Sequence, residues 1–108
     1  MARVYVAPLS PPEGAWPAAG EGRRVDLGRR SLAFFVVDGR LHAIDDACPH
    51  RGESLARGFV EDCAVECPAH GWRFSLLSGA MLESTRVAVS TYAVEVAEDG
   101  GVWVELPD

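Results

Sequence analysis

The amino-acid sequence predicts an all-β domain, a small antiparallel barrel or sandwich with two loops projecting from one end. Short β-prone runs alternate with turns that contain Gly, Pro or Asp along most of the 108 residues. The dipeptide Asp38-Gly39 stands between two apolar runs, which is a strong signal for a two-residue hairpin. No stretch has the length and periodicity of a long helix. A chain of this length is expected to form one domain around one core.

The expected strands are short runs rich in Val, Phe, Tyr and other strand-forming residues. In chain order they cover residues 3–7, 23–27, 31–37, 40–44, 58–62, 64–66, 73–76, 80–83, 92–97 and 102–106. Residues 10–20 are expected to be a loop because Pro and Gly are frequent there. Ser78-Gly79 and residues 98–101 supply two further turns, and residues 55–57 are expected to form a single helical turn.

Two short Cys–His stretches carry the chemistry of the chain. Cys48 is followed by His50, and Cys67 is followed by His70, so each stretch supplies one thiolate and one imidazole. Together they make a four-ligand metal site, and two outcomes fit these ligand types: a structural zinc ion, or an iron–sulfur cluster in which two His replace two Cys on one iron. The Cys-x-His spacing is tighter than the gaps typical of zinc sites. It therefore favours a cluster that spans two metal atoms.

The flanking residues Cys48-Pro-His-Arg-Gly and Cys67-Pro-Ala-His-Gly-Trp-Arg-Phe resemble the two cluster loops of the Rieske family. The resemblance extends from about residue 3 to residue 106. It implies a single Rieske [2Fe–2S] domain over residues 1–108, with a cluster-binding subdomain formed by loops at about 46–54 and 66–73. It also implies that Cys48 and Cys67 ligate one iron and that His50 and His70 ligate the other.

The prolines and glycines of the two stretches are expected to shape the loops. Pro49 and Pro68 stiffen their turns and remove a backbone N–H that would otherwise need a partner. Gly52 and Gly71 allow either a close approach of the backbone to the cluster or a positive φ.

Within the Rieske family, the chain resembles the soluble, low-potential ferredoxins. Glu53 and Ala69 stand where respiratory members have cysteines that form a disulfide, and Trp72 and Phe74 stand where those members have a serine and a tyrosine. Hydrogen bonds to sulfur raise the reduction potential. Without those hydroxyl groups we expect a reduction potential at the low end of the Rieske range, about −150 mV. Many members cover the cluster with a proline-containing loop, but residues 83–88 contain no proline.

The resemblance implies an electron carrier between a flavin reductase and a terminal oxygenase of the aromatic-ring dioxygenase type, and no enzyme in its own right. Rieske oxygenases add an iron site with two His and a carboxylate, whereas only His42 remains here. The alternatives are the small subunit of an NADH-dependent nitrite reductase, which would dock on its large subunit, and a zinc-stabilised binding module. The net charge of −6 argues against nucleic acid and suits redox protein partners. Without an apolar run or a leader, we expect a cytoplasmic protein that does not bind membranes.

Three further residues are expected to be structural. Cys63, in an alternating stretch before the second loop, is interpreted as a small hydrophobe on a strand. His42 is expected on a strand surface. Trp103 is expected to be a core residue of an alternating strand, and Trp16 either packs over the barrel or anchors a partner.

Overall fold

The structure is a computed structural model that describes residues 2–6, 21–49, 52–69, 71–84 and 86–107. The loop expected at residues 10–20, and Trp16 within it, lie outside the described residues. The elements, in chain order, are β1 (Ala2–Val6), β2 (Gly22–Leu27), β3 (Arg30–Val37), β4 (Arg40–Asp45), the 3-10 turn η1 (Leu55–Arg57), β5 (Phe59–Glu61), β6 (Ala64–Glu66), β7 (Arg73–Ser75), β8 (Thr91–Tyr92), β9 (Val94–Val96) and β10 (Val102–Leu106). The all-β prediction and the predicted helical turn are confirmed.

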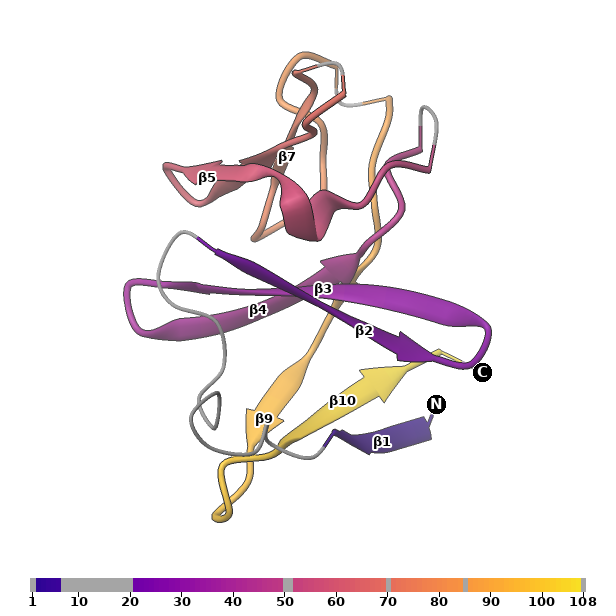
Figure 1. Cartoon of the computed structure of the whole chain (residues 1–108), viewed down its shortest axis with the longest axis vertical. Helices are drawn as coiled ribbons and strands as arrows, with labels where there is room; N and C mark the ends of the chain where they lie inside the picture. Colours follow the sequence, from indigo (N-terminus) through magenta and orange to yellow (C-terminus); the bar gives the residue numbers. More distant parts are fainter. Residues whose placement is uncertain (1, 7–20, 50–51, 70, 85, 108) are drawn as a thin grey trace.

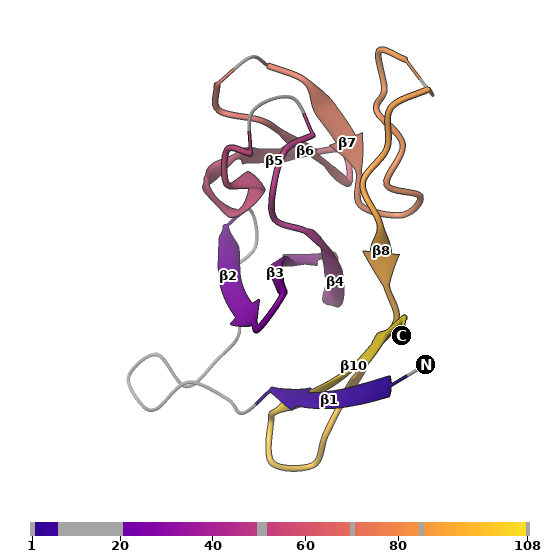
Figure 2. The same cartoon turned by 90° about the vertical axis from the view of Figure 1, so that its right-hand side faces the viewer.

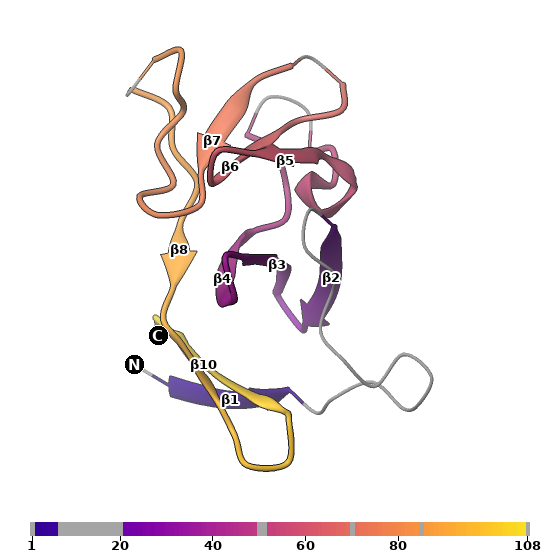
Figure 3. The same ribbon diagram turned by 90° about the vertical axis from the view of Figure 1, so that its left-hand side faces the viewer.

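The strands form three antiparallel sheets that are stacked as layers (Figure 1). The lower sheet has the order β1-β10-β9, the middle sheet β2-β3-β4-β8 and the upper sheet β5-β6-β7. Figure 3 shows the same order of layers from the side. The predicted hairpin between β3 and β4 is present, with Asp38 and Gly39 both at positive φ (52° and 76°). The twist of such a turn matches the twist of the strands that it joins.

The middle sheet is buried on both of its faces, which explains the continuous apolar run of β3. Leu32 and Phe34 pack into a core shared with the lower sheet, whereas Ala33 and Phe35 pack into a second core shared with the upper sheet. All four side chains are fully buried. Because successive residues of a strand point to opposite faces, the part of β3 that is covered by both layers is apolar at consecutive positions.

The prediction of one continuous strand over residues 92–97 is wrong in one respect, because the structure divides this segment between two strands. Thr91–Tyr92 pairs with β4 of the middle sheet, and Val94–Val96 pairs with β10 of the lower sheet. Ala93 lies at the crossing between the two. Figure 2 shows β8 leaving the middle sheet towards the lower one. This segment ties two layers together, which one continuous strand in one sheet would not do.

The strand predicted over residues 80–83 is replaced by isolated bridges, Phe74 with Met81 and Ala80 with Ala88. The turn at Ser78-Gly79 is present, and the Gly79 amide donates to the Ser75 carbonyl at 2.8 Å. Beyond it the chain folds back on itself, so successive residues bond to different partners and no regular ladder can form.

Trp103 is not a core residue. Its neighbours Val102 and Val104 are fully buried, so the alternation of β10 turns Trp103 to the outer face, where it is 37% exposed. There its ring lies 5.3 Å from the Tyr5 ring and 5.3 Å from the Arg3 guanidinium.

Candidate metal centre

Two backbone hydrogen bonds close the first loop: the Cys48 amide donates one, and the Cys48 carbonyl accepts the other. The Cys48 amide donates to the Glu53 carbonyl at 2.8 Å, and the Gly52 amide donates to the Cys48 carbonyl at 2.7 Å. Cys48 therefore stands at the base of a tight turn that follows the end of β4. Pro49, the next residue, is exposed.

The second loop repeats the same turn between β6 and β7. The Cys67 amide donates to the Trp72 carbonyl at 2.7 Å, and the Gly71 amide donates to the Cys67 carbonyl at 3.0 Å. The spacing of the bonded residues is the same as in the first loop, five and four positions along the chain. Two separate stretches of sequence thus build one local structure with a cysteine at the same place in each.

The two glycines are required for their backbone conformation. Gly52 and Gly71 each have a φ of +74°, and among the described residues beyond their chain neighbours no atom lies within 4 Å of the place where a Cβ would stand. A residue with a side chain is strained in this left-handed region even where space is free. Of the two roles expected for these glycines, the structure supports the positive φ.

Both cysteines are buried in the same apolar cluster. Cys48 is 2% exposed and Cys67 is 1% exposed, and both thiols are free of disulfides. The buried residues that share this cluster are Ala33, Phe35, Ile44, Leu55, Val65, Phe74, Leu76, Met81 and Val89. His50 and His70 lie outside the described residues. The described part of the chain thus supplies two buried thiols in one core, which fits a thiolate-ligated metal group.

The base of the first loop is held by Asp46, which sequence analysis did not single out. Its carboxylate is almost fully buried, with 2% of the residue exposed. One carboxylate oxygen, Oδ1, accepts hydrogen bonds from the Ser54 hydroxyl at 2.8 Å and from the Ala56 amide at 3.0 Å. The Asp46 carbonyl accepts a further bond from the Leu55 amide at 2.7 Å. Asp46 therefore joins the chain before the loop to the chain after it.

The base of the second loop rests on the β6–β7 hairpin and on an exposed ion pair. The Arg73 amide and guanidinium donate to the two carboxylate oxygens of Glu83, at 3.1 and 2.7 Å. The Leu82 amide donates to the Arg73 carbonyl at 2.8 Å. The guanidinium lowers the pKa of the Glu83 carboxyl below its usual value. The proline-free segment thus begins at Glu83 with a firm attachment to β7.

Cys63 lies in a turn, not on a strand as predicted. Asp62 and Cys63 join β5 to β6 with φ values of 53° and 57°. The half-buried Cys63 packs against the core that contains the two loop cysteines, as expected of a small hydrophobe. Its sulfur lies 4.0 Å from Nε2 of His42, which is half-buried on β4.

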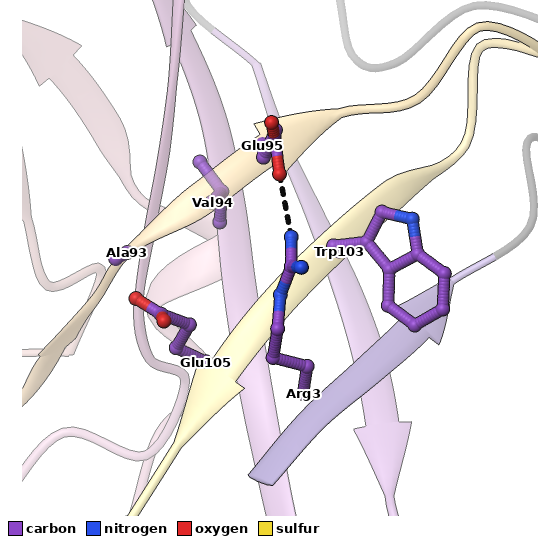
Figure 4. A pocket seen from close by; sticks show the side chains of 6 residues that line it. All are labelled: Arg3, Ala93, Val94, Glu95, Trp103 and Glu105. Atoms are coloured by element: carbon purple, nitrogen blue, oxygen red, sulfur yellow. Dashed lines mark hydrogen bonds and ion pairs between the residues drawn. The ribbon is translucent and has the colours of Figure 1, made fainter. Parts of the chain in front are cut away.

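A surface hollow on the lower sheet lies at the opposite end of the molecule from the cysteine loops (Figures 1 and 4). Its lining includes Arg3, whose guanidinium is 2.5 Å from the Glu95 carboxylate, and the outward-facing Trp103. It contains no thiol or imidazole, so it has no part in the metal centre. Among the described residues, no helix has the length and apolar character that crossing a bilayer would require.

Comparison with known proteins agrees with this geometry. The Rieske [2Fe-2S] domain model matches residues 12–93. The 3-phenylpropionate/cinnamic acid dioxygenase ferredoxin subunit of Shigella flexneri serotype 5b (strain 8401) is 38% identical over 111 residues, which cover 100% of this chain and 97% of that protein. One chain of the solved complex of reduced oxygenase and oxidized ferredoxin in carbazole 1,9a-dioxygenase is 32% identical, with a TM-score of 0.74 and coverage of 96% and 100%.

A third likeness comes from the nitrite reductases. A Mycobacterium tuberculosis protein described as the small subunit of an NADH-dependent nitrite reductase is 26% identical, with a TM-score of 0.77 and coverage of 96% of both chains.

These findings confirm the predicted fold and select between the two metal sites that the ligand types allowed. The cofactor is a Rieske-type [2Fe–2S] cluster and not zinc, and the role is that of an electron-transfer component. The matching model covers most of the chain, and the match includes both cysteine loops. The chain belongs to the Rieske [2Fe–2S] domain family.

Proposed function

We propose that Cys48, His50, Cys67 and His70 hold the [2Fe–2S] cluster, and that the chain carries electrons from a flavin reductase to the terminal oxygenase of an aromatic-ring dioxygenase system. The observation that carries this proposal is the repeated turn, which begins at a buried cysteine in both loops. In each turn a histidine follows the cysteine, two positions later in the first and three in the second. The pattern of one thiolate and one imidazole per loop matches the His₂Cys₂ ligand set of Rieske centres.

The residues of the chain divide the work around this site. The cysteines lie on its inner side, where the apolar cluster excludes water from the sulfur atoms. The cluster, when bound, supplies one-electron oxidation and reduction. The two positive-φ glycines turn each loop back on its cysteine, which fixes where the thiolates stand.

The aromatic-ring dioxygenase assignment is supported by what similar proteins do. The Shigella flexneri relative is the ferredoxin subunit of a dioxygenase, and the carbazole dioxygenase structure is a complex of an oxygenase with a ferredoxin. Once His50 and His70 are assigned to the cluster, His42 is the one histidine left in the sequence, which is too few for an iron site with two His and a carboxylate. The substrate chemistry is therefore assigned to a separate oxygenase.

The ligand assignment is tested by replacing each histidine in turn. The oxidised protein should be red-brown, and after reduction without oxygen it should give a Rieske-type EPR signal. His50→Ala and His70→Ala should each abolish that signal, because each removes one imidazole from iron. His42→Ala is the matched control and should keep the signal. A full Rieske signal in either loop variant would contradict the assignment.

The low potential proposed for this centre has a separate test. Trp72 and Phe74 follow Cys67 and carry no hydroxyl group, so neither can donate an O–H bond to sulfur. We expect a midpoint reduction potential of about −150 mV, measured by an EPR-monitored redox titration. A midpoint above zero would contradict the expectation.

The second candidate function is the small subunit of a nitrite reductase, which the Mycobacterium tuberculosis likeness favours. The two functions differ in the partner that binds. Stable co-purification with a large, sirohaem-containing subunit would favour the nitrite reductase, whereas electron delivery to a separately purified ring-hydroxylating oxygenase would favour the ferredoxin.

A further inference from the structure

The outer face of the upper sheet carries an unusually exposed aromatic side chain. Phe59 of β5 is 70% exposed, and cross-strand pairing places it in one row with Glu66 of β6 and Arg73 of β7. The intervening residues of this sheet, Val60 and Val65, face the core instead. Phe59 therefore points away from the core. A single apolar side chain in water is common, whereas several that gather in one hollow are typical of a binding surface.

This row forms part of a groove that has acidic side chains. We name it the β5–β7 groove, and it is lined by Phe59, Glu61, Asp62, Glu66, Arg73 and Leu82, among others. Leu82 is 51% exposed, so the groove has two apolar side chains open to solvent.

The charges of the groove are unbalanced. Arg73 is engaged by Glu83, as its two hydrogen bonds to that carboxylate show. Glu61, Asp62 and Glu66 form no ion pair with any described residue. The one guanidinium of the groove, Arg73, is shared between Glu83 and the weaker attraction of Glu66 and Glu61. Carboxylates therefore outnumber cations around the apolar side chains, and this excess of negative charge complements a basic surface.

The groove borders the second cysteine loop directly. Glu66 is the last residue of β6 and precedes Cys67, and Arg73 is the first residue of β7 and follows Trp72. The upper sheet that carries this row is the layer most distant from the lower sheet (Figures 1 and 3). A protein seated on the groove would lie beside the loop that contains Cys67.

We propose that the β5–β7 groove is a docking surface for a redox protein that presents a basic surface, with Phe59 entering an apolar hollow of that partner. This inference rests on the proposed function as an electron carrier. The carboxylates attract and orient the partner, and burial of Phe59 and Leu82 stabilises the docked complex. The docked partner therefore contacts the side of the upper sheet as well as the tips of the cysteine loops.

A cross-linking experiment tests the docking without any electron transfer. Cytochrome c, a basic haem protein rich in lysine, serves as the probe. A water-soluble carbodiimide condenses a carboxylate with a lysine amine to an amide, and the carboxylate oxygen leaves as part of the urea by-product. Because this chain contains no lysine, its carboxylates cross-link almost only to the probe. We expect mass spectrometry to find Glu61, Asp62 and Glu66 joined to it, and Glu95 of β9 and Glu98 of the turn that follows not joined.

Stopped-flow kinetics test the contribution of each part of the groove. One electron passes from the reduced ferredoxin to the ferric haem, which becomes ferrous. We expect Glu61→Gln with Glu66→Gln to slow this reaction about tenfold at low ionic strength and to flatten its salt dependence. The matched control, Glu95→Gln with Glu98→Gln, changes the net charge equally and should slow it less than about twofold. Phe59→Ala should slow it several-fold at every ionic strength.

The proposal would be overturned if both double variants slowed the reaction equally, since net charge alone would then explain the effect. It would also be overturned by cross-links that favour the lower sheet, or by a Phe59→Ala variant with an unchanged rate. The EPR signal of each variant shows that its cluster is intact. Loss of that signal from the wild-type protein would contradict the proposed function instead, and cross-linking would still decide the docking surface.

Discussion

The two cysteine loops share one turn and differ in what holds that turn in place. In both, the cysteine amide and carbonyl bond to residues five and four positions later, and a glycine at +74° completes the turn. The first loop rests on Asp46, a buried carboxylate that bonds to the chain on the far side of the loop. The second rests on a β-hairpin, with an exposed ion pair at its edge.

This difference shows that the same turn can be held in place by different contacts. The ends of a hairpin are already held together by ladder bonds, so the second loop needs no buried polar group. The ends of the first loop belong to no hairpin ladder: they are paired by one isolated bridge, Ala47 with Ser54, and by the backbone bonds of Cys48 with Glu53 and of Asp46 with Leu55. A side chain must therefore supply the missing bonds, and a buried carboxylate is costly unless all of its bonds are made. The first loop should thus be the more vulnerable to single substitutions.

The largest effect is expected for Asp46→Ala. This change removes the acceptor of the Ser54 hydroxyl and of the Ala56 amide and leaves both donors without that partner. Two bonds to a charged group are together worth roughly 3 kcal/mol. We expect the thermal midpoint to fall by at least about 10 °C. The measurement is loss of the visible absorbance of the cluster on heating, with iron per chain determined beforehand.

Asp46→Asn is the control for this prediction, because its side-chain oxygen can still accept both bonds. It should recover a clear part of the lost stability and retain the cluster. If Asp46→Ala proved as stable as the wild-type protein, the first loop would have another support and the comparison would fail.

Local patterns in the sequence predicted the hairpin at Asp38-Gly39, because its signal lies in two adjacent residues. The turn glycines were predicted for the same reason. Asp46 was not, since its partners Ser54 and Ala56 lie eight and ten positions away and only the folded chain brings them near. Contacts of this kind leave no periodic pattern.

The phase of a strand was harder to predict than its existence. Trp103 was predicted as a core residue of an alternating strand, but both of its neighbours, Val102 and Val104, are also apolar. Glu105, two positions later and therefore on the same face, was the available signal that this face is the outer one. The division at Ala93 had no comparable signal, because residues 92–97 suit either of the two sheets that share them.

A smaller effect is expected from alanine at the two glycines of the shared turn. Gly52→Ala and Gly71→Ala each place a side chain at a φ of +74°, which costs about 1 kcal/mol or somewhat more. We expect both thermal midpoints to fall by about 5 °C and by similar amounts, because neither added Cβ meets an atom of the other described residues beyond its chain neighbours. The same heating experiment measures both. A much larger fall of the thermal midpoint for one variant than for the other would show that the two turns are not equivalent.

The smallest effect is expected for Glu83→Gln in the support of the second loop. Its ion pair with Arg73 is exposed, with side-chain exposures of 37% and 51%, and exposed pairs contribute little to stability. Arg73 lowers the pKa of the Glu83 carboxyl in the folded protein. The pair therefore stabilises the fold above the unfolded-state pKa, and this contribution is lost as the pH falls through the lowered folded-state pKa. Thermal midpoints of wild type and variant should differ slightly at pH 7 and converge at strongly acidic pH. A gap that persisted there would assign the role of Glu83 to packing and not to its charge.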